Sequence, residues 1–261
     1  MALSDGTVSL QMAMDLLEGL EQEALFLAYQ PVYEVRTGRP RGVEALLRWR
    51  HESRGVLLPG AFLPPDLGTG IGAAITDFVL QEAIAQCSVW RHSGLDITVA
   101  VNVWPAGLTD DVVPERVADL LRRYDVPADH LTIEVTEQAC NIDPAAVRET
   151  FTALARIGVR LSLDDFGLGD SSLSRLQQLH FDELKIDRSF VKNALTEPTD
   201  RNIIEFSTQL AHSLGIQVVA EGVESETVLE LLADLDVDFA QGFHMQRPTA
   251  PASIASLFAP A

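Results

Sequence analysis

Hydrophobic residues recur along the chain with two kinds of spacing, one typical of helices and one typical of strands. Leu10 to Gln22 carries apolar side chains at helical intervals and predicts an amphipathic helix. Two β-rich segments follow, Leu25 to Val35 and Pro40 to Arg50, and the Thr37-Gly38 pair between them predicts a turn. After this pair, short apolar runs alternate with helical stretches to the end of the chain.

The later apolar runs have the length of buried strands, and the stretches between them have the length of helices. The predicted strands are Asp96–Val103, Leu131–Glu137, Val159–Asp165, Asp182–Asp187, Gln217–Val223 and Val237–Phe243. The predicted helices include Thr109–Tyr124, Pro144–Ile157, Asn202–Leu214 and Ser225–Leu235. Strands that alternate with helices indicate a mainly parallel sheet with crossover connections.

About eight β segments in 261 residues favour a closed TIM-like (β/α)8 barrel. A doubly wound open sheet is the alternative, although no GxGxxG sequence follows any predicted strand. No linker or low-complexity tract interrupts the sequence, so residues 1–261 predict a single domain. Within it, the N-terminal helix covers about residues 10–22 and the barrel about residues 25–260.

The acidic balance narrows the choice of partners. The chain has 38 acidic and 19 basic residues and a formal net charge of −19, which argues against binding to DNA or RNA backbones. A phosphate-ester substrate would therefore need a cation between itself and the protein. Because no run of 18 apolar residues occurs, we expect no membrane insertion and a cytoplasmic protein. Cys87 and Cys140 are too few for a disulfide scaffold and predict buried small residues.

Almost every predicted strand carries, near its end, a residue that can ligate a metal or bear a charge. These residues are Glu44, Asn102, Glu134, Asp164, Asp165, Lys185, Glu221 and Gln241. A single acid at a strand end is usually a helix cap or a surface residue. Five carboxylates at the C-terminal rim of one barrel would instead repel one another unless cations neutralise them.

The chemistry of this set indicates which cation would bind. Carboxylates and one amide, without His or Cys, favour Mg²⁺ or Mn²⁺ over zinc or copper. Asp164 and Asp165 can both reach one site only if the backbone turns there, and Gly167 and Gly169 permit such a turn. Lys185 has two compatible interpretations: a salt bridge that relieves carboxylate crowding, and a cation that helps activate a metal-bound water.

At this point the sequence resembles the EAL-domain family of cyclic di-GMP phosphodiesterases. The motif that names the family stands at Glu44-Ala45-Leu46, and seven further short motifs follow the family's order and spacing from about Leu10 to the C-terminus. They are YQP at Tyr29–Pro31, VNV at Val101–Val103, EVTE at Glu134–Glu137, DDFG at Asp164–Gly167, KID at Lys185–Asp187, AEGVE at Ala220–Glu224 and AQGF at Ala240–Phe243.

The resemblance implies a role for each matching residue. It implies a barrel whose first strand is antiparallel to the rest, cyclic di-GMP as the ligand, two Mg²⁺ or Mn²⁺ ions and a homodimer. The implied metal ligands are Glu44, Asn102, Glu134, Asp164, Asp165 and Glu221. The implied catalytic residues are Lys185, Glu44, Asp165 and Glu224, of which Glu224 acts from behind the ligands. The implied substrate contacts are Gln30, Arg48 and Gln241, and Glu137 is implied to steady the loop after the paired aspartates.

Three stretches depart from the family pattern. Leu168 and Asp170 replace Thr and Tyr in the loop after DDFG, which in the family couples the dimer interface to the metal site. Pro65 to Gly68 lies in a stretch that is more acidic in the family and bears on substrate clamping. Trp104 stands where small polar residues are usual, and predicts either core packing or stacking on a guanine.

Three functions fit these residues. The first is metal-dependent hydrolysis of one phosphodiester bond of cyclic di-GMP to linear pGpG. The second is a cyclic di-GMP receptor that binds without cutting, and the third is a partner-binding module that has abandoned the nucleotide. Because none of the implied ligands is substituted, the sequence favours the enzyme.

Overall fold

The computed structural model describes residues 14–63, 69–104, 108, 112–141, 143–168 and 176–259. A helix over residues 14–21 precedes the barrel, in agreement with the described part of the predicted N-terminal helix. The strands are β1 (Leu25–Glu34), β2 (Pro40–His51), β3 (Gly55–Leu57), β4 (Thr98–Asn102), β5 (Leu131–Thr136), β6 (Arg160–Phe166), β7 (Glu183–Ile186), β8 (Gln217–Ala220) and β9 (Phe239–Ala240). The α-helices that follow in the described ranges include α2 (Thr69–His92), α4 (Val112–Tyr124), α5 (Pro144–Ile157), α7 (Arg188–Asn193), α8 (Pro198–Ser213), α9 (Glu226–Asp234) and α10 (Pro251–Phe258).

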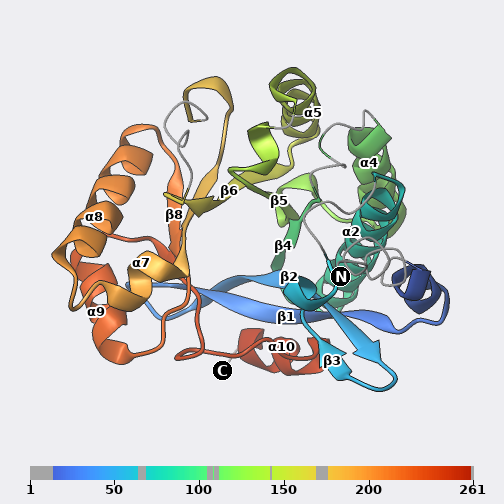
Figure 1. Cartoon of the computed structure of the whole chain (residues 1–261), viewed down its shortest axis with the longest axis horizontal. Coiled ribbons are helices and arrows are strands. Elements are labelled where there is room, and N and C mark those ends of the chain that lie inside the picture. The colour runs from blue at the N-terminus through green and yellow to red at the C-terminus, as the bar shows by residue number, and fades with distance from the viewer. Residues whose placement is uncertain are drawn as a thin grey trace, which may run out of the picture.

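The described strands close into a barrel. The order β1-β9-β8-β7-β6-β5-β4-β2 is completed by pairing of β1 with β2, and β3 extends β2 outside the ring as a hairpin. β1 is antiparallel to both of its neighbours, β2 and β9. All other neighbouring strands of the ring, from β2 and β4 round to β8 and β9, are parallel to each other. Figure 1 shows the strands around the centre of the view with the helices outside them. The TIM-like barrel with an antiparallel first strand is therefore confirmed, and the open sheet is excluded.

Local sequence explains why several elements begin and end where they do. α5 spans the predicted Pro144–Ile157 because Asp143 caps its first turn through Ala145 and Ala146, and Gly158 ends it in the left-handed conformation at φ +94°. α8 begins at Pro198, four residues before the predicted start, because proline is favoured in the first turn of a helix. The start predicted for the helix at Thr109 falls outside the described residues.

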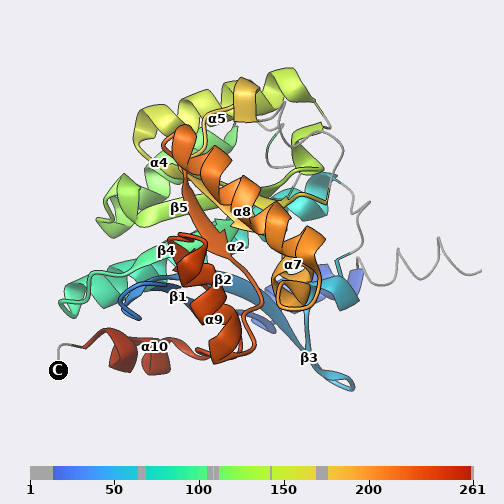
Figure 2. The same cartoon turned by 90° about the vertical axis from the view of Figure 1, so that its left-hand side faces the viewer.

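Helices cover the outer face of the barrel. α2 and α4 lie together on one side, α7, α8 and α9 on the other, and α10 packs against β1 (Figures 1 and 2). The apolar core fills the space between this helical layer and the strands, with Ile84, Val117, Leu154 and Ile204 among its fully buried members. None of the helices in the described ranges is long and apolar enough to cross a membrane.

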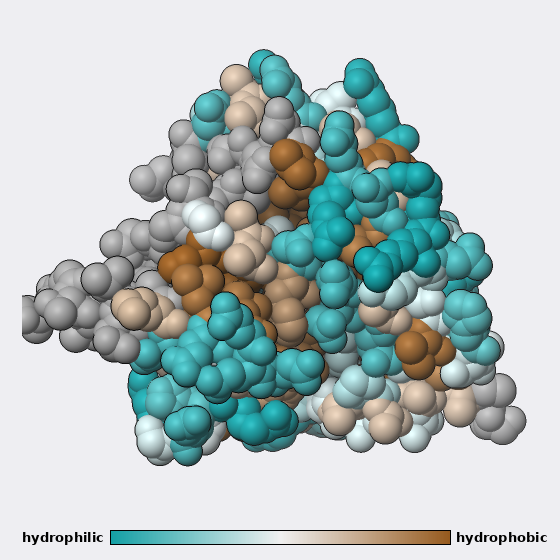
Figure 3. Space-filling model, turned by 90° about the vertical axis from the view of Figure 1, so that its right-hand side faces the viewer, coloured by the Kyte–Doolittle hydropathy of each residue, from teal (hydrophilic) through white to brown (hydrophobic). Residues whose placement is uncertain are grey.

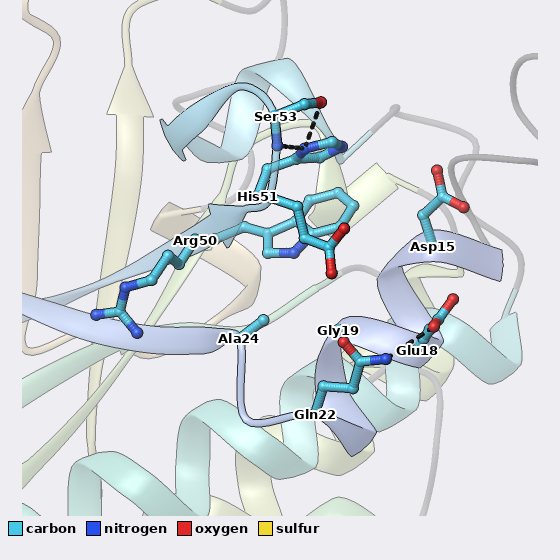
Figure 4. A pocket seen from close by; sticks show the side chains of 10 residues that line it. Asp15, Glu18, Gly19, Gln22, Ala24, Arg50, His51 and Ser53 are labelled. Atoms are coloured by element: carbon cyan, nitrogen blue, oxygen red, sulfur yellow. Dashed lines mark hydrogen bonds between the residues drawn. The ribbon is translucent and has the colours of Figure 1, made fainter.

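Two close approaches need glycine. A Cβ on Gly42 would lie 2.1 Å from Thr98 Oγ1 and 2.8 Å from the Thr98 carbonyl oxygen, so only glycine lets β2 and β4 pair here. A Cβ on Gly19 would lie 2.9 Å from Trp49 Nε1, so glycine lets the helix over residues 14–21 reach the indole of Trp49. Between this helix and the end of β2 is a hollow of about 240 Å³, whose polar lining includes Glu18 and His51 (Figure 4).

Candidate active site

The polar residues predicted at the strand ends do converge at one rim of the barrel. Glu44 lies in β2, Asn102 ends β4, Glu134 lies in β5 and Asp164 in β6, and neighbouring members are close in register. Asn102 pairs with Glu134, and Thr136 pairs with Asp164. On the other side of the ring Lys185 lies in β7, and Glu221 and Gln241 directly follow β8 and β9. The parallel strands thus bring together side chains that are far apart in the sequence.

Lys185 occupies the middle of this group. Its side chain is 1% exposed, and its Nζ lies 2.7 Å from Glu221 Oε1 and 3.1 Å from Glu134 Oε2. Nζ also lies 3.3 Å from Glu44 Oε2 and 3.6 Å from Asp164 Oδ1. One ammonium therefore contacts four carboxylates from four different strands or strand ends. We call these five residues, Glu44, Glu134, Asp164, Lys185 and Glu221, the rim cluster.

Two amide side chains hold Glu44 within the rim cluster. Asn102 Nδ2 donates to Glu44 Oε1 at 2.8 Å and to Glu134 Oε2 at 3.1 Å. Gln241 Nε2 donates to Glu44 Oε2 at 2.6 Å and to Glu221 Oε1 at 3.2 Å. The side-chain Oε1 of Gln241 is buried and has no hydrogen-bond partner among the residues that the structure describes. Both amides therefore hold adjacent carboxylates that would otherwise repel each other.

Burial and crowding displace the titration of the carboxylates. Burial, together with neighbouring carboxylates, raises the pKa of Asp164 to about 6 and that of Glu221 to about 8, and raises the pKa of Glu134 well above its usual range. Glu44 is the exception: burial opposes its ionisation, but Lys185 and the two amides lower its pKa below the ordinary value. Burial likewise opposes the charge on Lys185, yet the surrounding acids raise its pKa.

The second aspartate reaches the rim through a backbone irregularity within the strand. Asp165 has a φ of +57°, and the register of β6 with β7 shifts between Leu163 and Phe166. Gly167 adopts the expected positive φ, at +98°, but the residue whose left-handed backbone conformation changes the direction of the chain within β6 is Asp165. Burial and the nearby Asp187 raise the pKa of Asp165, while Lys185 lowers it.

Sequence reasoning assigned no role to Asp187, a carboxylate close enough to Asp165 to raise the pKa of Asp165. Asp187 is buried, and its carboxylate accepts hydrogen bonds from the backbone and hydroxyl of Ser189, which caps α7. Alternation along β7 could have indicated it, because residues two apart share a face of a strand and Asp187 follows Lys185 by two.

Besides Asn102, Asp165 and Gln241, four residues to which the resemblance gave a role are not members of the rim cluster. Gln30 pairs with Glu44 in register, but its amide donates to the carbonyl of Gln246 at 3.1 Å. Arg48 donates to the carbonyl of Leu47, and burial lowers its pKa. Glu137 is buried, and the loop that it was expected to steady falls outside the described residues. Glu224 is exposed between β8 and α9, and its role stays a prediction.

An apolar pocket adjoins the rim cluster on the side of α2. It has a volume of about 640 Å³, shares Asn102 with the site, and is lined by Leu46, Leu63 and Trp104 among others. Figure 3 shows the side that carries α2, where a recessed hydrophobic area borders hydrophilic surface. Trp104 is half-buried: its side chain packs against the core and also lines this pocket.

Two of the loops that depart from the family pattern lie partly outside the described residues. Leu168 is exposed, and its backbone N–H donates to the carbonyl of Asp165 at 3.3 Å. Asp170 and Pro65 to Gly68 lie outside the described residues, as does Pro105.

The donor set fits a hard divalent cation. Four carboxylates share one ammonium, and burial, followed by the repulsion between neighbouring carboxylates, raises the pKa values of Glu134, Asp164 and Glu221. All donors are oxygens, as Mg²⁺ and Mn²⁺ prefer. Within the described residues, no three His, Cys, Asp or Glu side chains are already arranged to hold a metal ion. The acids surround an ammonium instead, and a metal would have to share them with it.

A closed barrel with acidic residues gathered at its C-terminal rim has the architecture of a barrel enzyme, because barrel enzymes build their active sites at that rim. The chain belongs to the EAL-domain family, since the family's EAL domain model matches residues 13–248.

Relatives and solved structures agree with this assignment. The chain is 38% identical over 240 residues to MucR of Pseudomonas aeruginosa, a bifunctional diguanylate cyclase/cyclic di-GMP phosphodiesterase, covering 92% of this chain and 35% of MucR. It is 34% identical over 246 residues to the signalling protein YkoW of Bacillus subtilis, covering 94% of this chain and 31% of YkoW. The chain thus spans about a third of the length of these curated relatives.

Two solved structures have the same architecture. The MucR phosphodiesterase in complex with c-di-GMP superimposes with a TM-score of 0.88 at 37% identity, covering 94% of this chain and 99% of that one. The EAL domain of Mycobacterium smegmatis DcpA superimposes with a TM-score of 0.77 at 33% identity, covering 90% and 96% of the two chains.

Proposed function

We propose that this protein is a metal-dependent phosphodiesterase that hydrolyses one phosphodiester bond of cyclic di-GMP and releases linear pGpG. The observation that carries the proposal is the rim cluster, in which four carboxylates and Lys185 meet at the end of the barrel where active sites form. Similarity to a phosphodiesterase solved with c-di-GMP supports the choice of substrate.

Glu44, Asn102, Glu134, Asp164, Asp165 and Glu221 would hold two Mg²⁺ or Mn²⁺ ions. When bound, such ions supply charge neutralisation at the phosphate and lower the pKa of a water, so that hydroxide forms at neutral pH. Metal binding would explain why mutually repulsive carboxylates gather here. The metal ions would also be the cations that a protein of net charge −19 needs in order to bind a phosphate ester.

The chain's own side chains prepare the reaction. Lys185 is buried and stays charged, so its ammonium stabilises negative charge on the attacking oxygen and on the phosphate. Asn102 and Gln241 fix the direction of the Glu44 carboxylate. Arg48 is half-buried near the rim with a planar guanidinium suited to phosphate or guanine, and Gln30 lies opposite Glu44 on β1.

The proposal predicts a defined product. We would incubate the purified chain with cyclic di-GMP and either Mg²⁺ or Mn²⁺, and separate the products by liquid chromatography. Appearance of pGpG with either metal, and its absence with EDTA, supports the phosphodiesterase. Tight binding of intact nucleotide under both metals would make the protein a receptor, and absence of binding would favour a partner-binding module. The homodimer implied by the resemblance stays a prediction that light scattering of the same sample tests.

A further inference from the structure

Lys185 lies at the centre of four carboxylates that are proposed above as metal ligands. Its Nζ lies between 2.7 and 3.6 Å from oxygens of Glu44, Glu134, Asp164 and Glu221. An ammonium has three N–H donors, so it cannot give each of four carboxylates a full hydrogen bond. The four carboxylates that contact Nζ are among the residues proposed above to hold the metal ions.

Without a metal, the rim cluster depends on this one positive charge. Buried carboxylates in mutual contact are costly unless a cation compensates them, and no other Lys or Arg side chain of the described residues forms an ion pair with these four acids. A metal that enters must therefore attract carboxylates away from the ammonium. Both cations favour the same acids but repel each other.

We propose that Lys185 is the resident cation of the metal-free protein: it holds the four carboxylates of the rim cluster in place and opposes the entry of a divalent metal. Lys185 therefore sets the metal affinity of the site as well as the stability of the metal-free barrel. The proposal rests on the function proposed above only in that the rim cluster binds a metal, and it is independent of the substrate.

The direct test is Lys185→Met, which keeps an unbranched side chain of similar length and removes the charge. Isothermal titration with Mn²⁺ should show an affinity roughly tenfold or more tighter than that of the parent protein, because a repelling charge is gone. In EDTA, the melting temperature of the variant should fall by roughly 10 °C, because four buried acids lose their counter-ion. Mn²⁺ should raise the melting temperature of the variant more than that of the parent.

Arg41→Met is the matched control. Arg41 pairs with the buried Glu183 at 2.8 Å inside the barrel, and Glu183 precedes Lys185 by two residues on β7, toward the opposite end. Its loss should lower the melting temperature equally in EDTA and in Mn²⁺ and leave the Mn²⁺ affinity unchanged. This control separates loss of any buried cation from loss of the cation that competes with the metal.

A double variant keeps the test valid if Lys185→Met does not fold without metal. Glu221 makes the shortest contact with Lys185, so Lys185→Met combined with Glu221→Gln removes one charge of each sign and should restore folding in EDTA. A methionine that failed for steric reasons would not be rescued in this way, and that result would overturn the proposal.

The titrations also separate this inference from the proposed function. Mn²⁺ binding by parent and variant with equal affinity, or weaker binding by the variant, overturns the resident-cation proposal alone. Absence of Mn²⁺ binding by both proteins overturns it together with the metal-dependent phosphodiesterase.

Discussion

Replacement of Glu44 by glutamine separates the chemical role of this carboxylate from its structural role. The substitution keeps the shape of the side chain and removes its charge. In the folded protein, Glu44 accepts one hydrogen bond from Asn102 and another from Gln241, and it contacts the ammonium of Lys185 at 3.3 Å. The amide of Glu44→Gln keeps one acceptor but presents a donor to the second of these partners.

The structure predicts a small change in stability. One mismatched hydrogen bond costs about 1 kcal/mol, and Gln241 can reduce this cost by turning its side-chain Oε1, which has no partner among the described residues, toward the new amide. Loss of the attraction to Lys185 is opposed by relief of the repulsion from Glu134 and the other acids. We therefore expect the free energy of unfolding to change by less than about 2 kcal/mol.

The predicted effect on turnover is much larger. If Glu44 is a metal ligand, its loss removes about 4 kcal/mol of transition-state stabilisation, which corresponds to about a thousandfold lower kcat. The assay is formation of pGpG at saturating metal, combined with urea unfolding of the same preparation. Turnover within tenfold of the parent would show that Glu44 is not a ligand.

Glu183→Gln provides the opposite pattern as a control. Glu183 is also a buried barrel carboxylate, but its hydrogen-bond partners are Arg41 at 2.8 Å and Ser162 at 3.1 Å, neither of which belongs to the rim cluster. Its neutralisation should lower the free energy of unfolding by about 2–3 kcal/mol and leave turnover per folded molecule unchanged. A large fall in turnover with Glu183→Gln would mean that any buried acid in this barrel supports activity.

Three further predictions concern the metal, the barrel wall and the thiols. Removal of divalent metal with EDTA should stop hydrolysis while the circular dichroism spectrum stays native, because Lys185 compensates the acids; unfolding in EDTA would contradict this. Gly42→Ala should lower the free energy of unfolding by about 3 kcal/mol or more, because the new Cβ would lie 2.1 Å from Thr98 Oγ1. In the control Gly60→Ala, the new Cβ would have nothing within 4 Å, so the midpoint of urea unfolding should stay nearly unchanged. Burial raises the pKa of Cys87 to about 11, and Cys140 is also buried. A thiol reagent at pH 8 should therefore label neither cysteine until guanidinium unfolds the protein. Rapid labelling of the native protein would show that the thiols are accessible.

The sequence alone predicted the elements that have strong local patterns. The apolar run Leu131–Glu137 became β5, and Pro144–Ile157 became α5 with its predicted bounds, because Asp143 and Gly158 mark its two ends. It did not indicate that Asp165 would adopt a positive φ within β6, since that conformation accompanies the altered register with β7. β3, which pairs only with the end of β2, also went unpredicted because three residues carry no usable periodicity.

The sequence by itself determined which residue types stand at the strand ends, and hence that oxygen-bearing side chains would gather at one rim. Only the tertiary structure decided how they meet. Glu44 and Gln241 are 197 positions apart in the chain and 2.6 Å apart in space, because β1 closes the ring between β2 and β9. The central place of Lys185 among four acids depends on distances between different strands. Periodicity specifies the face on which a side chain lies, whereas barrel closure and register specify its neighbours.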